Sequence, residues 1–123
     1  MGKRIRIKME SAEIEAELND SKISSKITEK LPIESTVRTW GEEIYFEIPV
    51  KESIDNPVKE VEKKDIGYWP EGNCFCIFFG PTPVSSEEKI IPASEVEVIG
   101  KVLSDIEGLK KVKSGEKVVI EEI

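Results

Sequence analysis

Residues 65–80 read DIGYWPEGNCFCIFFG, and this stretch decides the fold class. A turn of sequence PEGN at residues 70–73 separates the end of one strand from an apolar run at residues 74–79. Because that run is apolar on successive residues, it predicts a strand buried on both faces, as in a barrel strand covered by a helix or a loop. The flanking segments should then supply the other strands.

The N-terminal segment predicts a hairpin of two half-buried strands. Apolar residues alternate with basic ones from Arg4 to Met9 and with glutamates from Glu13 to Leu18. The outward faces of the two strands thus carry opposite charges, and each cross-strand pair would contribute about 0.2–1 kcal/mol.

A short helix is expected next, at residues 22–31. Asp20 or Ser21 can cap it, apolar residues recur at i, i+4 and i+8, and Pro32 stops it. The single apolar stripe predicts one buried helix face.

Residues 34–40 and 43–48 predict two further strands that turn at residues 41–42, because β-branched and aromatic residues dominate both. Residues 49–64 are polar and rich in turn formers, which predicts a surface loop with at most one short strand. Residues 84–88 predict a second loop, polar and mobile.

The C-terminal part predicts a strand at residues 96–102, a short helix at 105–111 and a last strand at 118–120. About eight strands and two short helices result. At roughly 100–200 residues per domain, the chain of 123 residues is expected to form a single domain, 1–123.

Composition excludes several function classes. The net charge of −7 and the pI of about 4.8 argue against nucleic acid or an anionic membrane as the main partner. The chain has no histidine, which excludes Ser-His-Asp and Cys-His catalysis and His-ligated zinc. No apolar run approaches the roughly 18 residues of a membrane span, and the start MGKRIRIKM lacks a secretory signal, so a cytoplasmic location is expected. Abundant glutamate and lysine with no glutamine are typical of hyperthermophile proteins.

Two stretches resemble the signatures of a known family. DIGYWPEGNCFCIFFGPTP at residues 65–83 and IPASEVEVIGKV at residues 91–102 are similar to the GYWP-GN-FFGPTP and PAS-V-V-IG patterns of a small prokaryotic cyclophilin-like family. The resemblance implies a mainly β fold, a closed eight-stranded antiparallel barrel with two short capping helices, one at each open end. Closure would remove the free edges of the sheet.

The resemblance also bears on activity. Cyclophilins are peptidyl-prolyl isomerases whose groove holds an arginine, a glutamine and a histidine, and these positions correspond here to Phe46, a position near Cys76 and a position near Val96. Three expected polar groups are thus replaced. Arg38, the only arginine outside the N-terminal strand, is the candidate catalytic residue, because it lies on the preceding strand and can reach the same groove.

Five aromatic side chains are candidates for ligand binding in a groove that holds a peptide segment or a small ligand: Tyr45, Phe46, Tyr68, Trp69 and Phe78. The alternative for each is to fill the barrel interior, which is the default for a single aromatic residue. Trp69 is the exception, because a tryptophan beside a turn is often partly exposed.

The sequence leaves three functions open. The leading hypothesis is a cyclophilin-like binding module without efficient isomerisation and with no cofactor. The alternatives are a weak peptidyl-prolyl isomerase in which Arg38 replaces the missing arginine, and a small interaction subunit that uses its acidic surface.

Two further patterns have simple structural explanations. Cys74 and Cys76 share a strand face and could bind a soft metal or form a redox pair, but two thiols without histidine do not complete a zinc site. We therefore expect buried, reduced cysteines and no metal. The glutamate pairs at residues 42–43 and 87–88 are expected in solvated turns.

Overall fold

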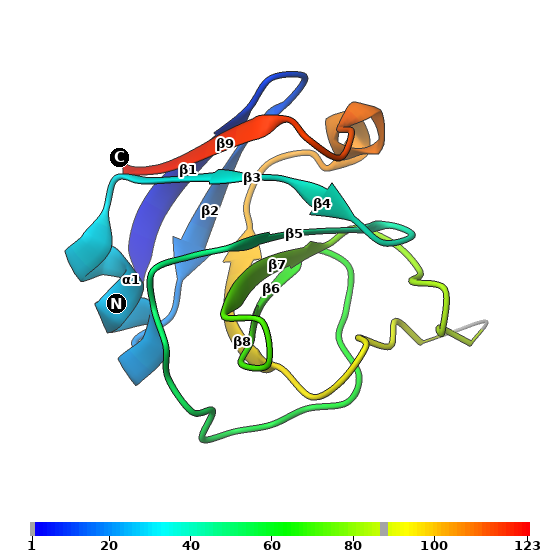
Figure 1. Ribbon diagram of the computed structural model, residues 1–123, viewed down its shortest axis with the longest axis horizontal. Coiled ribbons are helices and arrows are strands. Elements are labelled where there is room, and N and C mark those ends of the chain that lie inside the picture. The colour runs from blue at the N-terminus through cyan, green and yellow to red at the C-terminus, as the bar shows by residue number, and fades with distance from the viewer. Residues whose placement is uncertain (1, 87–88) are drawn as a thin grey trace.

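The strands form one antiparallel sheet that curls into a barrel (Figure 1). The computed structural model describes residues 2–86 and 89–123, and along the sheet the strands follow the order β3-β9-β1-β2-β8-β6-β7-β5-β4. Their bounds are β1 Lys3–Met9, β2 Glu13–Leu18, β3 Ile33–Thr36, β4 Arg38–Thr39, β5 Glu43–Glu47, β6 Asp65–Trp69, β7 Cys74–Phe78, β8 Glu97–Val102 and β9 Lys117–Glu122.

One bent segment brings the two ends of the sheet together. Only Val37 separates β3, which pairs with β9, from β4, which pairs with β5. Val37 is fully buried, and its N–H donates to the Glu116 carbonyl at 2.8 Å. The mainly β barrel is therefore confirmed, and within residues 2–86 and 89–123 it has nine strands where about eight were predicted, because this segment breaks at Val37.

The N-terminal hairpin matches its predicted pattern. Ile5 and Ile7 of β1 are fully buried, as the alternation requires, while the intervening Arg6 faces outward. Arg6 lies across the hairpin from Glu15, and its Nε is 3.5 Å from a carboxylate oxygen of Glu13. Opposite charges thus face each other outside the barrel as predicted.

The helix α1 (Lys22–Lys30) packs its apolar stripe on the barrel core. Of the two capping candidates, Ser21 is the cap, because its Oγ accepts from the Ser24 N–H at 3.2 Å. Ile23 and Ile27 are buried beneath the helix. The second predicted helix is instead one short 3-10 helix, Glu107–Lys111, which lies away from α1 in Figure 1.

Strand β7 is buried on both faces, as its apolar run predicted. Phe75 and Ile77 face the main core inside the barrel, whereas Cys74, Cys76 and Phe78 face outward into a second apolar cluster. The barrel therefore needs a cover over the outside of this strand.

Two loop segments supply that cover. Val58 forms an isolated bridge with Val96, and Val61 forms one with Ile90, so the predicted loop at residues 49–64 crosses the outside of the sheet beside the segment before β8. The cover extends over part of the outer face and leaves a hollow next to β5.

Part of the second predicted loop lies within the described residues. The Ser85 Oγ accepts from the N–H of Thr82 at 2.8 Å and of Ile91 at 3.0 Å, which ties residues 82–86 to the start of the next segment. Residues 87–88 lie outside the described residues, so the prediction that this glutamate pair is solvated stays a prediction. Among the described residues, no helix has the length and apolarity needed to cross a membrane.

We predict that Ile27→Ala lowers the free energy of unfolding by about 2–5 kcal/mol, because it leaves a cavity where the fully buried side chain seals α1 to the core. Guanidinium unfolding at pH 7 measures the change. Lys26→Ala is the matched control, since it lies on the exposed side of the same helix and should shift the free energy by less than about 0.5 kcal/mol. Equal losses in both variants would contradict the packing of α1.

Candidate functional site

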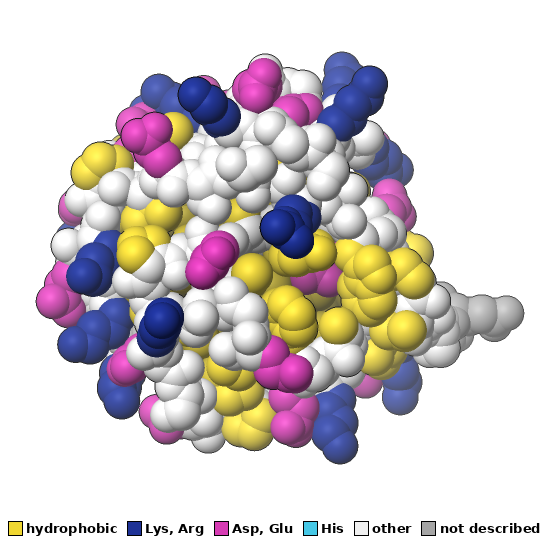
Figure 2. All heavy atoms as spheres, in the orientation of Figure 1, with side chains coloured by type: hydrophobic (Ala, Val, Ile, Leu, Met, Phe, Trp, Pro, Cys, Tyr) yellow, Lys and Arg dark blue, Asp and Glu magenta, His cyan; other side chains and the backbone are white. Residues whose placement is uncertain are grey.

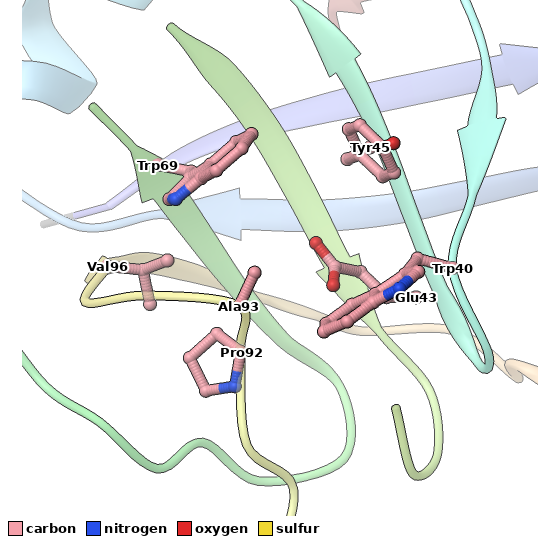
Figure 3. Close-up of a pocket in the computed structure, with 7 residues that line it drawn as sticks. All are labelled: Trp40, Glu43, Tyr45, Trp69, Pro92, Ala93 and Val96. Carbon is pink, nitrogen blue, oxygen red and sulfur yellow. The ribbon is translucent and has the colours of Figure 1, made fainter. Parts of the chain in front are cut away.

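A hollow on the outside of β5, β7 and β6 is the candidate functional site. Its volume is about 260 Å³, and aromatic and aliphatic side chains surround one carboxylate in it (Figure 3). Figure 2 shows hydrophobic side chains gathered on this face, with acidic atoms visible between them. The lining residues are Trp40, Glu43, Tyr45, Trp69, Pro92, Ala93 and Val96.

The tight turn between β4 and β5 places Trp40 opposite Glu43. The N–H of each residue donates to the carbonyl of the other, at 3.0 and 3.2 Å, as the predicted turn at residues 41–42 requires. Gly41 has φ +61, and a Cβ there would lie 2.8 Å from Pro83 Cδ, so the turn needs glycine at this position.

Strand alternation sets which side chains of β5 face the hollow. Glu43, Tyr45 and Glu47 point to the outside, whereas Ile44 and Phe46 belong to the main core. Across the strand pair, Tyr45 lies opposite Cys76 of β7. The floor of the hollow is thus the outer face of β7.

Glu43 is a buried carboxyl group in apolar surroundings. Its side chain is 6% exposed, and burial raises its pKa from 4.5 to about 7, although a hydrogen bond from the Cys76 thiol partly offsets this effect. No lysine or arginine forms an ion pair with it in the described part of the chain. The prediction of a solvated turn is wrong for Glu43, because it begins β5 and its side chain is buried in the outer hollow.

Trp69 is held in place from three sides. Its Nε1 donates to the Ser94 Oγ at 2.5 Å, and that hydroxyl in turn donates to the Glu71 carboxylate. A Cβ at Gly72 would lie 2.8 Å from the indole ring. The ring meets Tyr45 edge to face, with centroids 6.3 Å apart and planes at 85°.

A second hollow of about 530 Å³ adjoins the first. Tyr45 and Trp69 line both, so their two rings form the wall between them. The second hollow is more polar and includes Arg38 of β4, which lies opposite Tyr45, and Glu47.

The structure divides the five predicted aromatic residues into two groups. Tyr45 and Trp69 are half-buried and line the hollows. Phe46, which also borders the second hollow, is 1% exposed, and its ring stacks on that of Phe75 with the ring centroids 5.2 Å apart. Tyr68 and Phe78 are fully buried, and the Tyr68 hydroxyl donates to a backbone carbonyl in the loop after β5.

The side chain of Phe46, which the resemblance aligned with the groove arginine, faces the main core, and the neighbouring Tyr45 faces outward. Near the other aligned positions, Cys76 lies in the outer cluster and Val96 lines the hollow.

The two cysteines are free and buried, as predicted. Burial raises the pKa of Cys74 to about 11 and that of Cys76 well above its usual value, so both are thiols at neutral pH. Neither has two further ligands, since the described residues contain no group of three or more cysteine, aspartate or glutamate side chains suited to a metal ion.

Sequence reasoning missed Trp40, Glu43 and the rim at residues 92–93. One signal was present: in a two-residue hairpin turn the flanking residues share a sheet face, so Trp40 and Glu43 belong together once Gly41 fixes the turn. No sequence pattern places the rim, because it comes from a loop that crosses the sheet from β8.

We predict that Glu43 makes the protein less stable as pH rises from about 4.5 to about 7. The unfolded chain ionises this carboxyl near 4.5, whereas the folded chain keeps its proton to about 7, so folding takes up a proton between these values. The pKa difference corresponds to about 3 kcal/mol of unfolding free energy. Guanidinium unfolding at pH 4.5 and 8 should show that Glu43→Gln removes this loss, and an unchanged pH dependence would contradict the raised pKa.

Similar structures share the whole barrel. The solution structure of a hypothetical protein from Archaeoglobus fulgidus is 44% identical, with a TM-score of 0.85, and the match covers 99% of this chain and 95% of that one. The structure of McbB in complex with tryptophan is 14% identical, with a TM-score of 0.71, over 96% of this chain and 44% of McbB. The second likeness shows the fold alone.

Sequence comparison identifies the family. No curated protein matches the chain. The cyclophilin-like family matches residues 3–121, almost the full length, which agrees with the order of strands in the barrel. The chain belongs to the cyclophilin-like family.

Proposed function

We propose that this protein is a binding module whose outer hollow takes a small ligand or one side chain of a short peptide segment. The observation that carries the proposal is the pair of half-buried rings, Tyr45 and Trp69, held edge to face at the wall of an apolar hollow. Aromatic side chains left partly open around a concavity are typical of ligand sites.

The size of the hollow limits the ligand. At about 260 Å³ it lies just below the range of roughly 300–1,000 Å³ for small-molecule sites, so it fits one ring or one proline-sized group. The adjoining hollow behind Tyr45 and Trp69 gives room for a longer ligand or a peptide backbone to continue.

The Trp69 ring is arranged before any ligand arrives. The hydrogen bond to Ser94 and the close approach of Gly72 fix its orientation, which lowers the entropy cost of binding. A distant protein of the same fold, McbB, has a structure in complex with tryptophan. A small aromatic ligand for the present chain is consistent with that example.

We predict that Trp69→Ala weakens binding of benzyl alcohol or a short Ala-Pro peptide at least tenfold, because it removes one wall of the hollow. Shifts of indole N–H signals in two-dimensional NMR measure the affinity, and the only two tryptophans of the chain, Trp40 and Trp69, both line the site. In the variant Trp40 remains as the probe.

Tyr68→Phe is the control for this experiment. It keeps the buried ring and removes only the hydroxyl that bonds to the Val50 carbonyl at 2.7 Å, so ligand affinity should stay within twofold of the wild type. If neither probe perturbs Trp40 or Trp69 in the wild-type protein, the proposed binding function is wrong.

A weak peptidyl-prolyl isomerase is the second candidate. The observation in its favour is Arg38, a hydrogen-bond donor opposite Tyr45 that lines the second hollow. A positioned donor is what catalysis of prolyl isomerisation requires, since the rotation barrier is about 18–20 kcal/mol.

We predict no acceleration of cis/trans exchange in the Ala-Pro peptide, because Arg38 is exposed to water and lies in the second hollow, behind the Tyr45–Trp69 wall. Exchange NMR of the peptide with and without protein measures the rate. Faster exchange that persists in Arg38→Lys and is lost in Arg38→Ala, with peptide affinity retained, would support the isomerase instead.

A further inference from the structure

We propose that the hollow selects small organic cations: an ammonium group bound to the Glu43 carboxylate, carried by an apolar body that lies among Trp40, Tyr45 and Trp69. This inference rests on the proposed binding function and names the chemical class of the ligand. Three features support it: the aromatic wall of the hollow, the Glu43 carboxylate, and the absence of a basic partner for that carboxylate among the described residues.

The wall offers aromatic surface to a positive charge. Trp40, Tyr45 and Trp69 come from the β4–β5 turn, from β5 and from β6, and Figure 3 shows them arranged around one space with the Glu43 carboxylate between them. The faces of such rings carry negative partial charge and attract ammonium groups, most strongly where water is excluded. An apolar wall of aliphatic residues would lack this preference.

The carboxylate is the polar group that fixes orientation. Within the described residues its hydrogen-bond partner is the Cys76 thiol, a weak donor, and no basic side chain pairs with it. A buried carboxylate with so little compensation gains more from an ammonium group than from a neutral hydroxyl, because hydrogen bonds between charged groups are roughly twice as strong. An anionic ligand would meet repulsion.

The other charged groups near the site do not supply that compensation. Arg38 and Glu47 border the second hollow, beyond the ring of Tyr45. Glu42 is directed toward Gly80, on the far side of the turn. The buried Glu97 carboxylate accepts from two backbone N–H groups of the loop after β5 and is satisfied there.

The protein as a whole favours the same ligand charge. Its net charge of −7 raises the local concentration of small cations and lowers that of anions. The hollow and the net charge of the protein therefore both favour small cations.

The test compares benzylamine, a cation at neutral pH, with benzyl alcohol, its neutral counterpart of similar size. At pH 8 we expect benzylamine to bind at least tenfold more tightly to the wild-type protein, measured by the indole N–H shifts of Trp40 and Trp69. Lowering the pH to 6 should weaken the binding of benzylamine about tenfold, because Glu43, with a pKa of about 7, is then mostly protonated. The affinity for benzyl alcohol should not change.

Two variants complete the test. Glu43→Gln should reduce the preference for benzylamine to less than threefold and abolish the pH effect, while Glu34→Gln, an exposed carboxylate on β3 that lines neither hollow, should change neither. Equal binding of the two probes by the wild-type protein at pH 8 would overturn the cation proposal and leave the binding function standing. Binding of neither probe would overturn both. The comparison of benzylamine with benzyl alcohol on the wild-type protein tests the cation proposal even if Glu43→Gln fails to fold.

Discussion

Burial of both faces of β7 is the constraint on which the rest of the structure depends. Its inner side chains complete the barrel core, and its outer ones, Cys74, Cys76 and Phe78, would expose an apolar strip without a second layer. Loop segments rather than a helix provide that layer, held by isolated bridges such as Val58 with Val96. Because loops cover a sheet incompletely, the hollow is a direct result of how this barrel covers the outer face of β7.

The sequence predicts the strands and the helix because, within each of these elements, the periodic pattern of apolar residues determines which side chains are buried. The N-terminal hairpin, α1 and the double burial of β7 all follow periodic patterns, and the structure has them. The site follows a different rule. Glu43 is charged and next to a turn, which by composition predicts exposure to solvent, yet it is buried in a hollow that residues from distant parts of the chain, including 92–96, help to line. Phe46, predicted to line a groove, instead faces the core, because successive residues of a strand point to opposite faces of the sheet.

Burial of Glu43 has a free-energy cost that the fold alone does not require. A glutamine or an apolar residue could begin β5 as well, and burial removes the water that would compensate the charge, which raises the pKa of Glu43 to about 7. Ionisable groups with perturbed pKa values in apolar hollows mark functional sites more often than chance. The Tyr45–Trp69 pair lies at the same place, with Trp69 held by its hydrogen bond to Ser94, so a buried carboxyl group and an oriented aromatic pair meet on one surface.

The hollow presents a different polarity from the isomerase groove that the sequence resemblance implies. An isomerase offers a positive donor to a prolyl amide, whereas the hollow beside β7 offers an acceptor, the Glu43 carboxylate, with aromatic faces around it. Arg38, the donor that remains, lines the second hollow, whereas Glu43 lines the first, and Tyr45 and Trp69 border both. The proposed cation site would therefore leave a ligand that needs a positive donor unpaired.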